Sequence, residues 1–183
     1  SPCPSTSIAG ATGSGCGRRL RGMAGPWFTC EAADEAFLDA APLRLEGAFE
    51  IALPAERVWA DLTSERPLHW CRILSEVRWT SPRPFGVGTT REVKALWGAG
   101  WLRERYFRWE EGRRHSFCVV ETTNPMLRRL PEDYLVEPTS TSSCRFTWVI
   151  AVEPRPWARL ADPVNRAVLG TLFRDTRRHY AAV

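Results

Sequence analysis

The sequence of 183 residues contains no run of about eighteen apolar residues, so we expect no helix that spans a membrane. It also lacks a Cys-x-x-Cys pair, and the spacing of its six cysteines fits no zinc site. We therefore expect neither a metal nor a cofactor. Cysteines inside apolar runs, such as Cys118 and Cys144, are typical of buried free thiols in a reducing, cytoplasmic compartment. No catalytic-triad spacing, nucleophile elbow or phosphate-binding glycine loop is present.

Excess positive charge is confined to the N-terminal end. Residues 1–22 contain three arginines and no acidic residue, which leaves 22 basic against 21 acidic residues in the rest of the chain. A nearly neutral body argues against nucleic acid as a partner. We expect residues 1–22 to form a flexible tail, residues 23–42 an extension with a short helix, and residues 43–183 a single ligand-binding domain.

Aromatic residues, in contrast, are abundant: nine Trp and eight Phe are too many for a disordered chain. Alternation of apolar and polar residues over 45–53 predicts a half-buried strand. Pro54 suits the first turn of a helix with an apolar stripe along 55–62, and Pro67 starts a second short helix that reaches Leu74. A further short helix is predicted over Glu31–Ala41.

The middle of the chain is predicted to form an antiparallel meander, because turn residues recur at regular intervals. The predicted strands cover residues 89–97, 101–109, 115–122, 133–137 and 144–152. Asp162 and Pro163 then suit the start of a helix of roughly 28 Å that ends at Ala181. One helix cannot cover both faces of so large a sheet, so the sheet must curl around it and leave a cavity.

Three segments resemble the SRPBCC (START/Bet v 1-like) superfamily, and most of all its polyketide cyclase/dehydrase-like subgroup. Phe49–Thr63 resembles the opening strand and helix, Pro84–Arg91 the turn into the third strand, and Tyr106–Arg114 the next hairpin. The resemblance covers about residues 43 to 182. It implies an α+β helix-grip fold, with a curled antiparallel sheet of six to seven strands, a long C-terminal helix, and two short helices after the first strand. Catalysis is not implied, because the superfamily includes carriers and sensors as well as enzymes.

Alternation along the predicted strands groups the polar residues by the face of the sheet on which they lie, and this indicates which of them are candidates for the cavity. Arg91 shares its face with Val93, Ala95 and Trp97. In the next strand Leu102, Glu104, Tyr106 and Arg108 share one face, and Arg103, Arg105, Phe107 and Trp109 share the other. Alternation leaves open which of these two faces is inward; if it is the first, Glu104 and Tyr106 lie near Arg91. Arg91, Glu104 and Tyr106 are the catalytic candidates, with Glu104 either a general base or simply the counter-ion of Arg91. The residues expected to contact a ligand are Trp59, Trp70, Arg91, Val93, Trp97, Glu104, Tyr106, Phe117, Tyr134, Trp148, Leu169 and Phe173.

Three functions remain open on these residues. The first is a binding protein, monomeric or weakly dimeric, that carries, senses or sequesters a hydrophobic or planar small molecule such as a lipid or a polyketide-like compound. The second is a polyketide aromatase/cyclase or dehydratase that uses Arg91, Glu104 and a tyrosine. The third is a protein-binding role for the N-terminal segment and the arginines of the last helix.

Overall fold

The computed structural model describes residues 25–182, without the side chains of Trp97, Ala161 and Asp162. The predicted tail over residues 1–22 lies outside the described residues. The strands are β1 (Phe28–Thr29), β2 (Leu43–Ile51), β3 (Glu76–Trp79), β4 (Thr90–Ala95), β5 (Gly100–Glu110), β6 (Arg114–Thr122), β7 (Leu127–Arg129), β8 (Pro131–Pro138) and β9 (Cys144–Pro154). The helices are α1 (Glu35–Ala40), α2 (Ala55–Leu62) and α3 (Asp162–Ala181), with 3-10 turns at Leu96–Gly98 and Pro156–Ala161.

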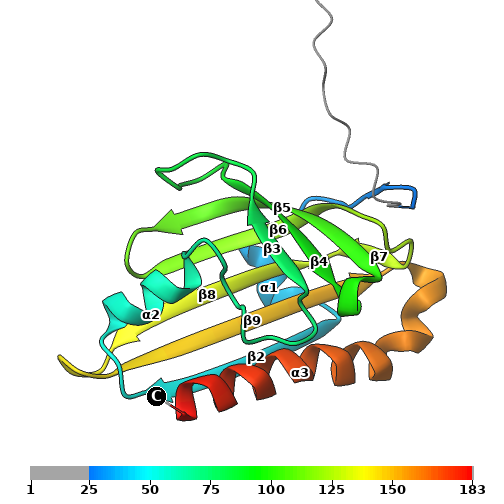
Figure 1. Cartoon of the computed structure of the whole chain (residues 1–183). Helices are drawn as coiled ribbons and strands as arrows, with labels where there is room; N and C mark the ends of the chain where they lie inside the picture. Colours follow the sequence, from blue (N-terminus) through cyan, green and yellow to red (C-terminus); the bar gives the residue numbers. More distant parts are fainter. Residues whose placement is uncertain (1–24, 183) are drawn as a thin grey trace, which may run out of the picture.

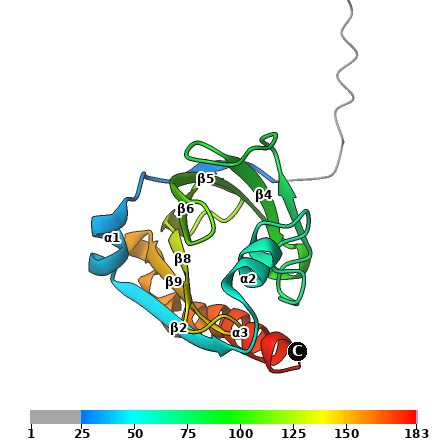
Figure 2. The same cartoon turned by 90° about the vertical axis from the view of Figure 1, so that its left-hand side faces the viewer.

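The main sheet has seven antiparallel strands in the order β2-β9-β8-β6-β5-β4-β3, with the short β1 paired to β6 and β7 paired to β9. Figure 1 shows α3 running along the sheet, and the end-on view in Figure 2 shows how strongly the sheet curls. Helices α2 and α3 lie on the concave side, whereas α1 lies outside (Figure 2). The predicted α+β helix-grip fold is confirmed.

Close contact between β2 and α3 depends on a glycine. Residues of β2 alternate strictly between buried and exposed, as the sequence pattern predicts. At Gly47 an added Cβ atom would lie 2.9 Å from the ring of Phe49 and 3.1 Å from the ring of Phe173 on α3. Only a residue without a side chain therefore lets Phe173 pack directly on the strand.

Two predicted helices differ from the structure. The segment Pro67–Leu74 forms successive turns instead of a second short helix, because Leu68 adopts a positive φ of 57° that a right-handed helix does not allow. Helix α1 begins at Glu35, four residues later than predicted. Its N-cap is Asp34, whose side chain accepts a hydrogen bond from the amide of Phe37 at 3.1 Å.

A β-bulge in β5 reverses the simple alternation of side chains after Tyr106. Tyr106 pairs with Phe117 but Arg108 pairs with Ser116, so one extra residue stands between them in β5. The alternation of side chains is thereby reversed. Trp109 consequently packs against Tyr106 on the concave side, and Arg108 turns to the outer face.

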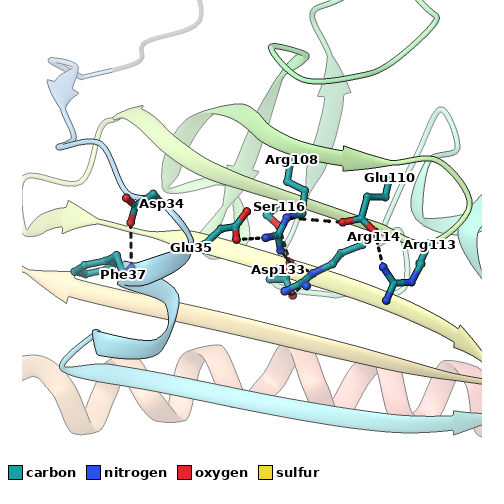
Figure 3. A network of polar contacts seen from close by, with 9 residues as sticks. All are labelled: Asp34, Glu35, Phe37, Arg108, Glu110, Arg113, Arg114, Ser116 and Asp133. Carbon is teal, nitrogen blue, oxygen red and sulfur yellow. Dashed lines mark hydrogen bonds and ion pairs between the residues drawn. The ribbon is translucent and has the colours of Figure 1, made fainter.

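The outer face of the sheet carries a polar network that holds α1 (Figure 3). Asp133 accepts hydrogen bonds from Arg114 at 2.9 Å and from Ser116 at 2.6 Å. Arg108 lies 3.9 Å from Asp133 and also pairs with Glu35 in the first turn of α1. Because these charges lie outside the barrel-like curl, they contribute to anchoring α1 and take no part in the cavity.

Candidate ligand-binding cavity

A cavity of about 280 Å³ lies between the concave face of the sheet and α3. Its wall is mainly aliphatic, with side chains from β4, β5, β8, β9, the loop before β3, and α3. Leu96, Met126 and Val164 belong to this wall and are also exposed to solvent, so they mark the mouth. The volume is close to the lower end of the roughly 300–1,000 Å³ range of small-molecule sites.

An ion pair between Arg91 and Glu104 forms one polar part of the wall. The two residues face each other directly across β4 and β5, and the carboxylate of Glu104 accepts a hydrogen bond from Nε of Arg91. Both side chains are almost completely buried. The guanidinium carbon lies 4.3 Å from the ring centre of Phe117 and 5.5 Å from that of Tyr106. Aromatic rings thus take the place of water around the cation.

A second polar group centres on Glu132 in β8. Its Oε2 atom accepts a hydrogen bond from the hydroxyl of Tyr134 at 3.1 Å and another from the indole Nε1 of Trp148 at 2.8 Å. Register places Tyr134 opposite Trp148 and Glu132 opposite Phe117. Glu132 and the Arg91–Glu104 pair therefore lie on the same concave face, with Phe117 on the strand between them.

In the part of the chain that the structure describes, the cavity wall holds two carboxyl groups but a single cation. Burial opposes the charged form of Arg91, yet the charge of Glu104 raises the pKa of Arg91 above its usual value. Burial raises the pKa of Glu104, although Arg91 opposes this. Burial and the negative charge of Glu104 raise the pKa of Glu132 to about 7. Because the buried Arg91 requires a counter-charge, Glu104 is the ionised carboxyl, and Glu132 holds a proton below neutral pH.

The structure brings six of the predicted ligand-contacting residues into the cavity wall: Arg91, Val93, Glu104, Tyr134, Trp148 and Leu169. The other five described side chains are absent from the wall, and that of Trp97 lies outside the described ones. Tyr106 and Phe117 pack behind it against Arg91. Trp59 packs on Trp109, Trp70 stacks on His179, and Phe173 packs on Trp148.

Glu132 is the main residue that the sequence reasoning missed. A signal was present, because Glu132 shares alternation with Tyr134, which was a candidate. The predicted strand begins at Asp133, two residues after the start of β8 at Pro131, and so leaves Glu132 out. His115, in contrast, does not belong to the cavity wall. Burial holds its pKa well below the usual value, and its neutral ring stacks on Trp109.

Two other kinds of feature are absent from the described part of the chain, a metal-binding cluster and a membrane-spanning helix. Among residues 25–182 there is no group of three or more His, Cys, Asp or Glu side chains able to hold a metal ion. No helix within the same residues is long and apolar enough to cross a membrane. Cys30, Cys71, Cys118 and Cys144 are buried free thiols, as predicted for Cys118 and Cys144, and burial raises the pKa of Cys71 to about 12.

Comparison with known proteins places this cavity in context. The model of a family described as polyketide cyclase / dehydrase and lipid transport matches residues 42–182. An uncharacterised protein of Mycobacterium tuberculosis is 29% identical over 157 residues, which cover 83% of this chain and 93% of that protein. The fold is similar to that of a START superfamily protein from Mycobacterium smegmatis, with a TM-score of 0.60 and 10% identity, over 76% of this chain and 97% of the other. It is also similar to that of the Zhui aromatase/cyclase from Streptomyces sp. R1128, with a TM-score of 0.57 and 15% identity, over 76% and 97% of the two chains.

Proposed function

The chain belongs to the polyketide cyclase / dehydrase and lipid transport family, and we propose that it binds a hydrophobic small molecule in the cavity under α3. It would act as a carrier, sensor or sequestering protein. The observation that supports this proposal is the cavity of about 280 Å³ with its mainly aliphatic wall and exposed apolar mouth. A preformed apolar cavity with a few polar groups at one place is the usual form of a small-molecule site.

The mouth supports a route by which such a ligand enters. Leu96 is 36% exposed, Met126 is 39% exposed, and Val164 at the start of α3 is 63% exposed, although each also lines the cavity. Apolar side chains that are continuous with an interior cavity lower the cost of moving an apolar molecule from water inward.

Binding to the cavity can be tested with the neutral fluorescent probe N-phenyl-1-naphthylamine. We expect its fluorescence to rise on addition of the protein and to fall when an aliphatic competitor such as 2-decanone is added. In the variant Leu169→Trp, which fills the cavity from α3, we expect the probe to bind at least about tenfold more weakly. The matched control is Ala167→Trp, an exposed position on the same helix that should leave binding unchanged. Equal affinity in the two variants would refute the cavity as the binding site.

A polyketide aromatase/cyclase or dehydratase is the second candidate, and the carboxyl group of Glu132 is what favours it. A group in the cavity wall with a pKa of about 7 can take up and release a proton at neutral pH. A base in this position would remove a proton from the carbon beside a ketone and leave an enolate, which then takes a proton back.

The two candidates predict different exchange of carbon-bound hydrogen in deuterated water. 2-Decanone serves as the probe. If the protein only binds it, the protons beside the carbonyl should exchange no faster with the wild type than with Glu132→Gln. Exchange is followed by proton NMR at pH 7.5. An acceleration by the wild type of about 100-fold or more, lost in Glu132→Gln, would favour enolisation chemistry over simple binding.

A further inference from the structure

The two oxygens of Glu132 have different surroundings. Oε2 accepts both available hydrogen bonds, from Tyr134 at 3.1 Å and from Trp148 at 2.8 Å. No hydrogen bond within residues 25–182 involves Oε1. The side chain belongs to the cavity wall. A proton on Glu132 therefore belongs on Oε1, because an oxygen that already accepts two donors is a poor place for a third hydrogen.

The charges around this site disfavour an anionic head group. Among the described residues of the cavity wall, Arg91 is the only cation, and Glu104 already neutralises it. Arg91 balances the negative charge of Glu104. A bound carboxylate would add a second negative charge to this buried space, and that charge would have no cation to balance it. An uncharged oxygen, in contrast, needs only a hydrogen-bond donor.

From this geometry we infer that protonated Glu132 donates a hydrogen bond from Oε1 to an uncharged oxygen of the ligand, and so selects carbonyl or hydroxyl head groups over carboxylates. The inference rests on the proposed function and names the head group that the cavity accepts. The bound state then requires a proton on Glu132, so the affinity for the ligand depends on pH.

Among the described titratable groups near Glu132, the proton of Glu132 itself is the one that is gained or lost around neutral pH. Glu104 and Arg91 form an ion pair, and burial raises the pKa of Tyr134 and of Tyr106 above the ordinary value for tyrosine. His115 on β6 stays neutral because its pKa is lowered, and Cys71 in the loop before β3 has a pKa of about 12. The cavity residues of α3 are uncharged: Val164, Asn165, Val168, Leu169 and Leu172.

The head-group preference can be measured with two competitors of equal chain length. Displacement of N-phenyl-1-naphthylamine is followed with 2-decanone and with decanoate at pH 7.5. We expect the ketone to bind at least about tenfold more tightly than the carboxylate. Decanoate that binds as tightly as the ketone would overturn the inference.

The role of the proton is tested by pH. For the wild type we expect the ketone to bind about 30-fold more weakly at pH 8.5 than at pH 6, since a carboxyl with a pKa of about 7 is ionised in all but about 3% of molecules at pH 8.5. In Glu132→Gln the amide oxygen accepts the two hydrogen bonds and the amide nitrogen donates toward the cavity. Ketone binding should therefore persist in this variant and lose its pH dependence.

Glu137→Gln, on the exposed end of the same strand, is the matched control and should behave as the wild type. A ketone affinity that does not change with pH in the wild type would overturn the inference. If the fluorescent probe still binds in that case, the proposed function stands and only the role of Glu132 fails. If neither the probe nor the ketone binds, both fail.

A measurement without any ligand tests the protonation itself. The folded chain holds the proton of Glu132 up to a pKa of about 7, whereas an ordinary glutamate loses it near 4.5. The folded state therefore binds more protons in that interval, and stability falls as the pH rises through it. We expect the free energy of unfolding in urea to fall between pH 5 and pH 8 by more in the wild type than in Glu132→Gln. An identical pH dependence in both would overturn the inference.

Discussion

Replacing Arg91 by methionine is expected to lower the free energy of unfolding by about 3–5 kcal/mol at pH 8. The substitution leaves Glu104 buried without its cation, beside a second buried carboxyl group at Glu132. Without Arg91 the pKa of Glu104 rises still further above its usual value, since only burial then acts on it. The loss is therefore expected to be smaller at pH 5, where Glu104 can be protonated. Urea denaturation at the two pH values measures both quantities.

Two further variants separate the buried charge from the packing of the side chain. Arg91→Met combined with Glu104→Leu removes both charges, and most of the lost stability should return. Arg103→Met makes the same change in the neighbouring strand, where Arg103 is 42% exposed and pairs with Glu92 and Glu121 near the surface, and should cost at most about 1 kcal/mol. A loss at Arg91 that is no larger than the loss at Arg103 would contradict our account of the pair.

Trp148→Ala is expected to destabilise the protein by a similar amount, about 3–5 kcal/mol, for a different reason. The indole is fully buried, with ring centres 5.1 Å from Tyr134 and 5.4 Å from Phe173 of α3. Its removal abolishes these contacts and enlarges the cavity. Glu132 also loses a hydrogen bond. Urea denaturation followed by circular dichroism measures the loss without relying on tryptophan fluorescence.

A tryptophan outside the core provides the comparison. Trp157 precedes α3 and is 65% exposed, so Trp157→Ala should change the free energy of unfolding by no more than about 0.5 kcal/mol. Similar losses in the two variants would show that the indole of Trp148 contributes far less to the core than its burial indicates.

Side-chain alternation predicted the parts of the structure that depend only on residues close together in the sequence. The pattern of β2 and the long apolar stripe of α3 each follow from a single period, and the structure contains both. Arg91 could be assigned to the inner face in the same way, whereas alternation left two possible faces for Glu104 and the structure places it on the inner one. That they lie directly opposite each other depends on the register between β4 and β5, which the connection over residues 96–99 sets.

The remaining features depend on contacts between distant segments. The bulge in β5 turns Trp109 inward, although simple alternation places it outside. The positive φ of Leu68 replaces a predicted helix by turns in a segment that packs against α3. Glu132 becomes a cavity residue because Trp148 and Tyr134, from two adjacent strands, both donate to it. The bulge and the positive φ leave no local mark in the sequence, whereas Glu132 is marked only by its alternation with Tyr134.

The position of β2 has a consequence for how the chain folds. Within residues 25–182, β2 pairs only with β9, so Leu43 meets Val152 and Ile51 meets Cys144, which lie 109 and 93 residues later in the chain. During synthesis the apolar face of β2 therefore has no strand to pair with until β9 has left the ribosome, and α3 follows later still. Pairing over such separations makes folding slow and exposes β2 to other chains in the interval. We expect the sheet to assemble cooperatively around β9, and a chain that ends before residue 144 to remain aggregation-prone.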